Sequence, residues 1–162
     1  MINDICGFST EGSLKAVAPY DCGLCVMHMQ GEPGTMQNNP HYGDVVAEVS
    51  DFLERQATKL VTAGVARNRI CLDPGFGFGK TLDDNLVLLR NLEVICKRLD
   101  LPVLAGLSRK SVVGALTGKP VDKRLAGNLA IALSAVSHGA SIVRVHDVGE
   151  MVDALKVWLA TQ

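Results

Sequence analysis

The sequence has 162 residues and a formal net charge of −1, with 48% hydrophobic and 20% charged residues. This balance is typical of one globular domain over residues 1–162 and excludes a disordered chain. A charge near zero excludes binding to nucleic acid by bulk electrostatics. No apolar run approaches the ~18 residues of a membrane span and no signal sequence is visible, so we expect a cytoplasmic protein without nucleic-acid or membrane partners.

Short apolar runs alternate with helical patterns along the chain. The runs typical of strands are Ile2–Ile5, Leu24–Met29, Arg69–Leu72, Val103–Leu107 and Ser141–Val145. Apolar spacings of three and four predict helices over Asp44–Val65, Leu82–Leu99, Asp122–Ser137 and Gly149–Ala160. Glycines at positions 64, 118 and 139 lie near expected helix ends, where a positive φ lets the chain leave the helix.

A strand followed by a helix, five times over, predicts an α/β fold with a parallel sheet and helical crossovers. The strands are apolar throughout, as strands buried on both faces are. Periodicity does not separate an open doubly wound sheet from a (β/α)₈ barrel. About 32 residues per unit is close to the ~31 of a ~250-residue barrel, which favours the barrel.

The five cysteines, an odd number without an export signal, favour reduced thiols over a disulfide framework. Cys22, Cys25 and His28 have a spacing that suggests zinc. No second pair follows at zinc-finger spacing, and Cys25 falls within an apolar run. We therefore interpret these two cysteines as buried structural thiols.

Polar residues follow all five apolar runs. They are Asn3-Asp4, Met27–Gly31, Asp73–Lys80, Gly106–Ser111 and Arg144–Asp147. Active sites of parallel βα folds lie at the carboxyl ends of the strands. Asp73 alone could cap a turn, and His146 alone could be a buried imidazole with its hydrogen bonds satisfied. Five sets at equivalent positions indicate one functional site.

Phosphate-binding motifs do not account for the glycine-rich stretch. Pro74 stands where a Walker loop needs its first glycine, and residues 75–79 lack the spacing of a dinucleotide fingerprint. Gly-x-Ser-x-Gly is also absent.

In order and spacing, five blocks resemble dihydropteroate synthase over the full length of the chain. These blocks are Ile2–Ile5, Met27–Gly31, Asp73–Lys80, Ser108–Ser111 and Arg144–Asp147. The resemblance implies a (β/α)₈ barrel. It also implies that 4-aminobenzoate is joined to 6-hydroxymethyl-7,8-dihydropterin diphosphate in folate biosynthesis, with release of diphosphate. This activity is a sulfonamide target, and the full family commonly forms homodimers.

The resemblance also implies roles for individual residues. Asn3 and Asp73 would face the pterin. A carboxylate can accept hydrogen bonds from the 2-amino group and the ring N–H groups of the pterin. Lys110 would donate to the ring acceptors of the pterin, and its stem would border the aminobenzoate. The walls of the slot for the flat ring would be Ile5, Met27, Phe78 and Gly106.

The remaining roles concern the two anionic groups. Ser108 would hold the aminobenzoate carboxylate, partly through a backbone N–H at a helix start. Arg144 and His146 would bind the diphosphate. Of all these residues, Lys110, Asp73 and Arg144 would be the catalytic ones. Mg²⁺ would accompany the diphosphate, with no metal ligand from this chain.

In this mechanism no side chain attacks the substrate. The pterin ring helps to ionise its methylene carbon, the anion contacts draw the diphosphate away, and the aminobenzoate nitrogen adds.

Five of the eight units of the family barrel would leave it incomplete, with two bare sheet edges. We therefore expect an N-terminally truncated barrel that is not a competent synthase alone and that self-associates or needs the other units. One alternative is a non-catalytic pterin-binding remnant or a partner-dependent fragment. Another is a pterin-dependent methyltransferase, against which Ser108-Arg109-Lys110 and the pair of Arg144 and His146 argue, because methyl transfer releases no diphosphate.

Overall fold

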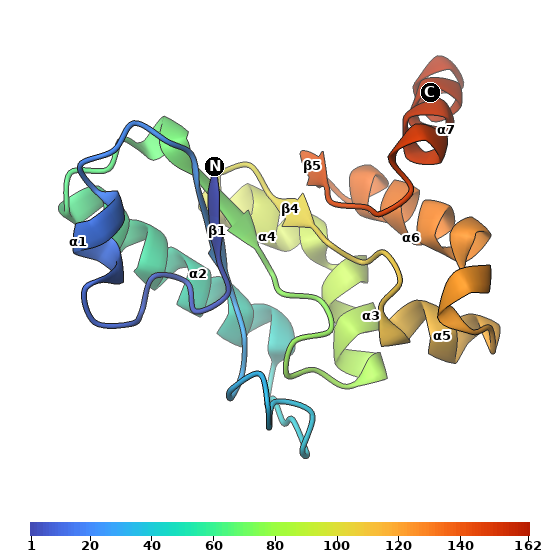
Figure 1. The fold of residues 1–162 in the computed structure, drawn as a ribbon, viewed down its shortest axis with the longest axis horizontal. Helices are drawn as coiled ribbons and strands as arrows, with labels where there is room; N and C mark the ends of the chain where they lie inside the picture. The colour runs from blue at the N-terminus through green and yellow to red at the C-terminus, as the bar shows by residue number, and fades with distance from the viewer.

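The computed structural model describes residues 1–162 and alternates strands with helices (Figure 1). The strands are β1 (Ile2–Asp4), β2 (Leu24–Met27), β3 (Ile70–Asp73), β4 (Leu104–Ala105) and β5 (Ile142–Val143). The helices are α1 (Ser13–Val17), α2 (Val45–Thr62), α3 (Leu82–Arg90), α4 (Leu92–Leu99), α5 (Ser111–Thr117), α6 (Leu125–Ser137) and α7 (Val148–Ala160). Single 3₁₀ turns at Arg67–Arg69 and Val121–Lys123 precede β3 and α6.

All strand pairs are parallel, and the strands follow one another in chain order. β1, β2 and β3 form one ladder, β4 and β5 form another, and a bridge between Leu72 and Val103 connects the two. This order lacks the reversal of a doubly wound sheet and is that of a barrel. Because β1 and β5 each pair on one side only, the sheet stays open. The prediction of an incomplete parallel barrel is confirmed.

Alternate residues of the strands face opposite sides of the sheet. One side packs on the helices through Leu24, Val26, Ile70, Leu72 and Val103. Cys25, Cys71 and Leu104 form a separate small cluster, and by alternation Met27 and Asp73 lie on the same side as that cluster. The expectation of fully buried strands holds for β2 and β3 and is wrong for β1 and β5, which are partly exposed because they are edges.

Helix α2 shows how side chains set the helix boundaries. The Asp44 carboxylate accepts the N–H groups of Val46 and Ala47, both at 3.0 Å, and therefore caps the helix. Val49 and Leu53 lie on its buried face. The helix ends before Gly64, whose φ of +92° confirms its predicted role at a helix end, as do the positive φ values of Gly118 and Gly139.

The structure corrects two predicted helices and adds two that were not predicted. The expected helix over Leu82–Leu99 is interrupted at Asn91, which leaves helical geometry while its side chain donates to the Val87 carbonyl. The expected helix from Asp122 starts only at Leu125, after a 3₁₀ turn. Helices α1 and α5 were not predicted, since five and seven residues are too few for a periodic pattern.

All five cysteines are free thiols. Cys25 is fully buried in β2, as predicted, whereas Cys22 is partly exposed, so its expected burial is wrong. None of the helices combines the length and the apolar character needed to cross a lipid bilayer.

Candidate active site

A cavity of about 250 Å³ lies beyond the carboxyl ends of β4 and β5. Six of the predicted site residues line it together with Val145. The six are Phe78, Gly106, Ser108, Lys110, Arg144 and His146. The chain order of the strands produces this convergence, because parallel strands end at the same edge of a sheet.

Asp73, the last residue of β3, is 1% exposed. Its Oδ1 accepts the backbone N–H of Gly75 at 2.8 Å, and its Oδ2 lies 3.4 Å from Nη2 of Arg144. Burial raises the pKa of Asp73, while the Gly75 N–H and the charges of Lys110 and Arg144 oppose that rise. The site therefore holds a buried carboxyl group that keeps acceptor capacity for a ligand.

Arg144 follows β5 and connects this carboxyl group with the cavity. Its side chain is 46% exposed, so it can meet a ligand and Asp73 at the same time. A Cβ atom at position 106 would lie 2.7 Å from Nη2 of Arg144. Only glycine at position 106 therefore leaves enough space for the guanidinium group of Arg144 where it lies.

Lys110 places a second cation in the cavity. Its Nζ donates to the Phe76 carbonyl and lies 4.5 Å from the centre of the Phe78 ring. Burial lowers the pKa of Lys110 to about 8, with Arg144 adding to that effect and Asp73 opposing it. An anionic or acceptor-rich ligand would restore the charge balance around this ammonium group.

Ser108 and His146 form a hydrogen-bonded pair that also lines the cavity. Ser108 Oγ lies 3.0 Å from Nδ1 of His146 and also accepts the His146 backbone N–H at 3.3 Å. Helix α5 begins only at Ser111. The expectation that the Ser108 N–H lies at a helix start is therefore wrong, and the Ser108 side chain instead joins the two strand ends.

The turn after Ser108 is supported from α6. Arg109 has a φ of +61°, and its N–H donates to the buried Asn128 Oδ1 at 2.9 Å. Arg124 donates to the carbonyl groups of Arg109 and Lys110, both at 3.2 Å. Sequence reasoning missed Asn128 and Arg124, although an asparagine on the buried face of an apolar helix is a signal for such a bond.

Besides Asp73, three predicted residues do not line this cavity. Asn3, in β1, has the one buried side-chain oxygen or nitrogen atom without a hydrogen-bond partner, its Oδ1. Met27 is fully buried at the end of β2. Ile5 is 38% exposed and follows β1 in a turn that Asp4 forms by accepting the N–H groups of residues 6 and 8, so the predicted strand to Ile5 is one residue too long.

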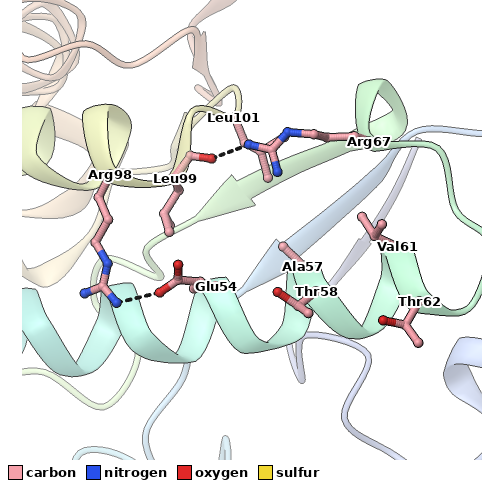
Figure 2. Close-up of a pocket in the computed structure, with 9 residues that line it drawn as sticks. All are labelled: Glu54, Ala57, Thr58, Val61, Thr62, Arg67, Arg98, Leu99 and Leu101. Carbon is pink, nitrogen blue, oxygen red and sulfur yellow. Dashed lines mark hydrogen bonds and ion pairs between the residues drawn. The ribbon is translucent and has the colours of Figure 1, made fainter.

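A second hollow, of about 270 Å³, lies between α2 and α4 on the helical side of the molecule (Figure 2). Its arginines already have partners within the chain. Arg98 pairs with Glu54 and Asp51 at 2.5 and 2.7 Å, and Arg67 donates to the carbonyl groups of residues 99 and 100. These bonds hold two helices and a loop together, which is a structural role.

Comparison with known proteins defines the class of this one. Residues 1–146 match the family model described as pterin binding enzyme. The chain therefore belongs to the family of pterin-binding enzymes. All the residues that line the cavity lie within the matched region.

The individual relatives are dihydropteroate synthases. That of Haemophilus influenzae is 47% identical over 99% of this chain and 58% of its own length. The crystal structure of the Stenotrophomonas maltophilia enzyme with active-site-bound imidazole is 51% identical, with a TM-score of 0.96 over 99% of this chain and 61% of that one. The Burkholderia cenocepacia enzyme complexed with 7,8-dihydropteroate is 55% identical, with a TM-score of 0.92 over 99% and 60%.

The chain thus spans about three fifths of the length of the relatives that it matches. The resemblance noted from the sequence motifs is confirmed.

Proposed function

We propose that this chain forms the part of a dihydropteroate synthase that binds dihydropterin diphosphate and 4-aminobenzoate for their condensation. The observation that carries this proposal is the cavity in which Lys110, Arg144 and His146 surround a space next to the buried Asp73. A buried acceptor beside three donors matches a substrate that combines a donor-rich ring with an anionic leaving group. The relative complexed with dihydropteroate supports the same substrate class.

The pterin would lie next to Asp73, on the side of the sheet that does not pack on the helices. Asp73 and the unpaired Oδ1 of Asn3 would accept its N–H groups, while Lys110 would donate to its ring acceptors. Phe78 and Gly106 would border the ring, with Met27 packed below and Ile5 at the rim. Ser108 would meet the aminobenzoate carboxylate beside His146.

Catalysis would rest on stabilising the leaving group. As the methylene–oxygen bond breaks, negative charge grows on the diphosphate, and Arg144 and His146 would bind that charge. Lys110 and Asp73 would hold the ring in place while the aminobenzoate nitrogen adds to the carbon. No side chain would form a bond to the substrate.

Mg²⁺ fits this site only as a companion of the diphosphate. The cavity presents cations, whereas Mg²⁺ prefers oxygen ligands. No group of three or more His, Cys, Asp or Glu side chains is placed to hold a metal ion. The diphosphate and water would have to supply the oxygen ligands, and we assign no step of the reaction to the metal.

A second copy of the chain and a cytoplasmic location complete the proposal. Helix α7 exposes Val148, Val152, Val157 and Leu159, apolar surface of the kind that homodimers bury. The five free thiols suit a reducing compartment. Sedimentation equilibrium of the chain, with a monomer as the contradicting result, tests the dimer.

Asp73→Asn tests the pterin assignment. We expect the chain to bind 6-hydroxymethyl-7,8-dihydropterin diphosphate, and the variant to bind it at least about tenfold more weakly, or about 1.4 kcal/mol. The reason is that the amide offers an N–H group where the pterin needs an acceptor. Isothermal titration with Mg²⁺ present measures both affinities, and Asp122→Asn, at an exposed position, is the control. Equal affinity of both chains would refute the role of Asp73, and no binding by the unaltered chain would refute the proposal.

Gly106→Ala tests the diphosphate assignment separately from folding. The new Cβ would meet only the end of the Arg144 side chain, which can move into solvent. We expect the free energy of unfolding to change by less than about 1 kcal/mol, while affinity for inorganic diphosphate falls about tenfold. Gly34→Ala, with no atom within 4 Å of its new Cβ, is the matched control. Unchanged diphosphate affinity in Gly106→Ala would show that Arg144 does not bind this group.

A further inference from the structure

The loop between β3 and α3 is held by side chains along its whole length. Five consecutive backbone carbonyl groups, those of residues 75–79, each accept a hydrogen bond from a side chain. The donors are, in order, Lys80 to residue 75, Lys110 to residue 76, Gln37 to residue 77, Lys80 to residue 78 and Tyr42 to residue 79. Such a loop takes its shape from these donors, because it has no strand or helix partner to define it.

Lys80 makes more of these bonds than any other residue. Its Nζ lies 3.0 Å from the Gly75 carbonyl, 3.2 Å from the Phe78 carbonyl and 3.0 Å from Nδ1 of His28. An ammonium group has three N–H donors, and here it meets three acceptors. Lys80 is 3% exposed, so these bonds are shielded from water.

His28 accepts from Lys80 only when Nδ1 carries no proton, which requires the neutral ring with its hydrogen on Nε2. The surroundings favour that form. His28 is 6% exposed, and its ring meets the Phe52 ring edge-on at 5.0 Å. Burial and the charge of Lys80 lower the pKa of His28 to about 3.

Lys80 does not line the cavity, unlike Lys110 and Arg144. Because all three N–H donors of its ammonium group are already used within the chain, its effect on a ligand must pass through the loop. The loop carries Phe78, whose ring lies against the Lys110 ammonium group, and it begins at Asp73. Movement of the loop backbone would therefore displace Phe78 and Lys110, the two residues that border the slot for the pterin ring.

We propose that Lys80, bonded to His28, is a positioning residue that fixes the 75–79 loop and so keeps Phe78 and Lys110 in place for the pterin. The effect on pterin binding rests on the proposed function, whereas the effect on the loop does not. Without the amine, two carbonyl groups and the His28 Nδ1 lose their buried donor. The loop would then rearrange to reach water, although the helices that pack on the sheet would remain.

Lys80→Met removes the amine and keeps a side chain of similar length, and Lys97→Met, at an exposed position on α4, is the matched control. Hydrogen exchange is followed at the amides of residues 75, 77 and 78, which donate within the loop or to Asp73 and Asn85. We expect exchange at least tenfold faster in Lys80→Met and unchanged in Lys97→Met. Urea unfolding of each variant establishes whether the fold as a whole persists. A folded Lys80→Met chain with unchanged exchange at these amides would overturn the proposal.

A second measurement needs no substitution. The ¹⁵N chemical shifts of the His28 ring in the unaltered chain report which nitrogen carries the proton. We expect hydrogen on Nε2, and in Lys80→Met a shift of the Nδ1 resonance as its donor is lost. Hydrogen on Nδ1 in the unaltered chain would overturn the proposal even if Lys80→Met did not fold.

Titration with 6-hydroxymethyl-7,8-dihydropterin diphosphate completes the test. We expect about tenfold weaker binding by Lys80→Met, together with the faster exchange. Faster exchange with unchanged pterin affinity would overturn the positioning role. Absence of pterin binding by the unaltered chain would refute the proposed function, and the exchange and ¹⁵N results would still decide how Lys80 acts on the loop.

Discussion

Gly75→Ala is expected to prevent folding or to destabilise the chain by at least about 4 kcal/mol, the upper range of single substitutions. A Cβ at position 75 would lie 1.8 Å from the carbonyl oxygen of His28 and 2.9 Å from its carbonyl carbon. These are backbone atoms of the adjoining strand end, which cannot rotate away as a side chain can. The His28 N–H also donates to the Asp73 carbonyl at 3.0 Å, so moving either segment breaks the pairing of β2 with β3.

The φ of Gly75, +69°, carries a separate cost of about 1–2 kcal/mol for any residue with a Cβ. Gly118→Ala isolates that cost, because Gly118 has a φ of +68° and no atom within 4 Å of its new Cβ. Chemical unfolding of the two variants and the unaltered chain gives both free energies. A Gly75→Ala chain no less stable than Gly118→Ala would show that the two strand ends are not in close contact.

The sequence predicted the parts of the site that depend on strand ends. Asp73 follows an apolar run, and Gly106 and Arg144 lie near the carboxyl ends of two others. A parallel sheet brings such positions to one edge whatever the detailed packing. The resemblance to the synthase motifs then suggested roles for them. The structure places six of the predicted residues around one cavity for this reason.

The parts that sequence reasoning missed depend on contacts between distant residues. Lys80 and His28 are 52 positions apart, and nothing in either motif indicates that the two side chains meet. The Asn128 side chain supports the turn at Arg109 across 19 positions. Such pairs follow from how the crossovers pack on the sheet, which periodicity does not describe.

Two errors in the predicted bounds of helices and strands can be traced to single side chains. The helix break at Asn91 has no glycine or proline to mark it. The Asn91 side chain adds a second bond to the Val87 carbonyl, which the Asn91 backbone N–H also meets. The turn after β1 carries a clearer signal. Asp4 accepts from the backbone N–H groups two and four residues ahead, a common use of an aspartate that ends a short strand.

Acid is expected to destabilise the chain through His28 between about pH 6.5 and pH 3. The pKa of His28 is lowered to about 3, from an ordinary value of 6.5, chiefly by burial and then by the charge of Lys80. Between these two values the unfolded chain binds a proton that the native chain does not. The free energy of unfolding must therefore fall as the pH falls through this range, by an amount on the order of 4 kcal/mol for this group.

Urea unfolding of the unaltered chain and of His28→Gln at several pH values from 7 to 3 isolates this contribution. Glutamine can still accept from Lys80 but does not titrate, so its stability should fall less steeply with acid than that of the unaltered chain. His41→Gln, at an exposed position, should keep the original pH dependence. The comparison uses slopes because His28→Gln also changes packing beside Phe52 and so lowers stability at every pH. Parallel curves for His28→Gln and the unaltered chain would mean that the imidazole takes up its proton in the native protein as readily as in the unfolded chain, and hence that Lys80 does not keep it neutral.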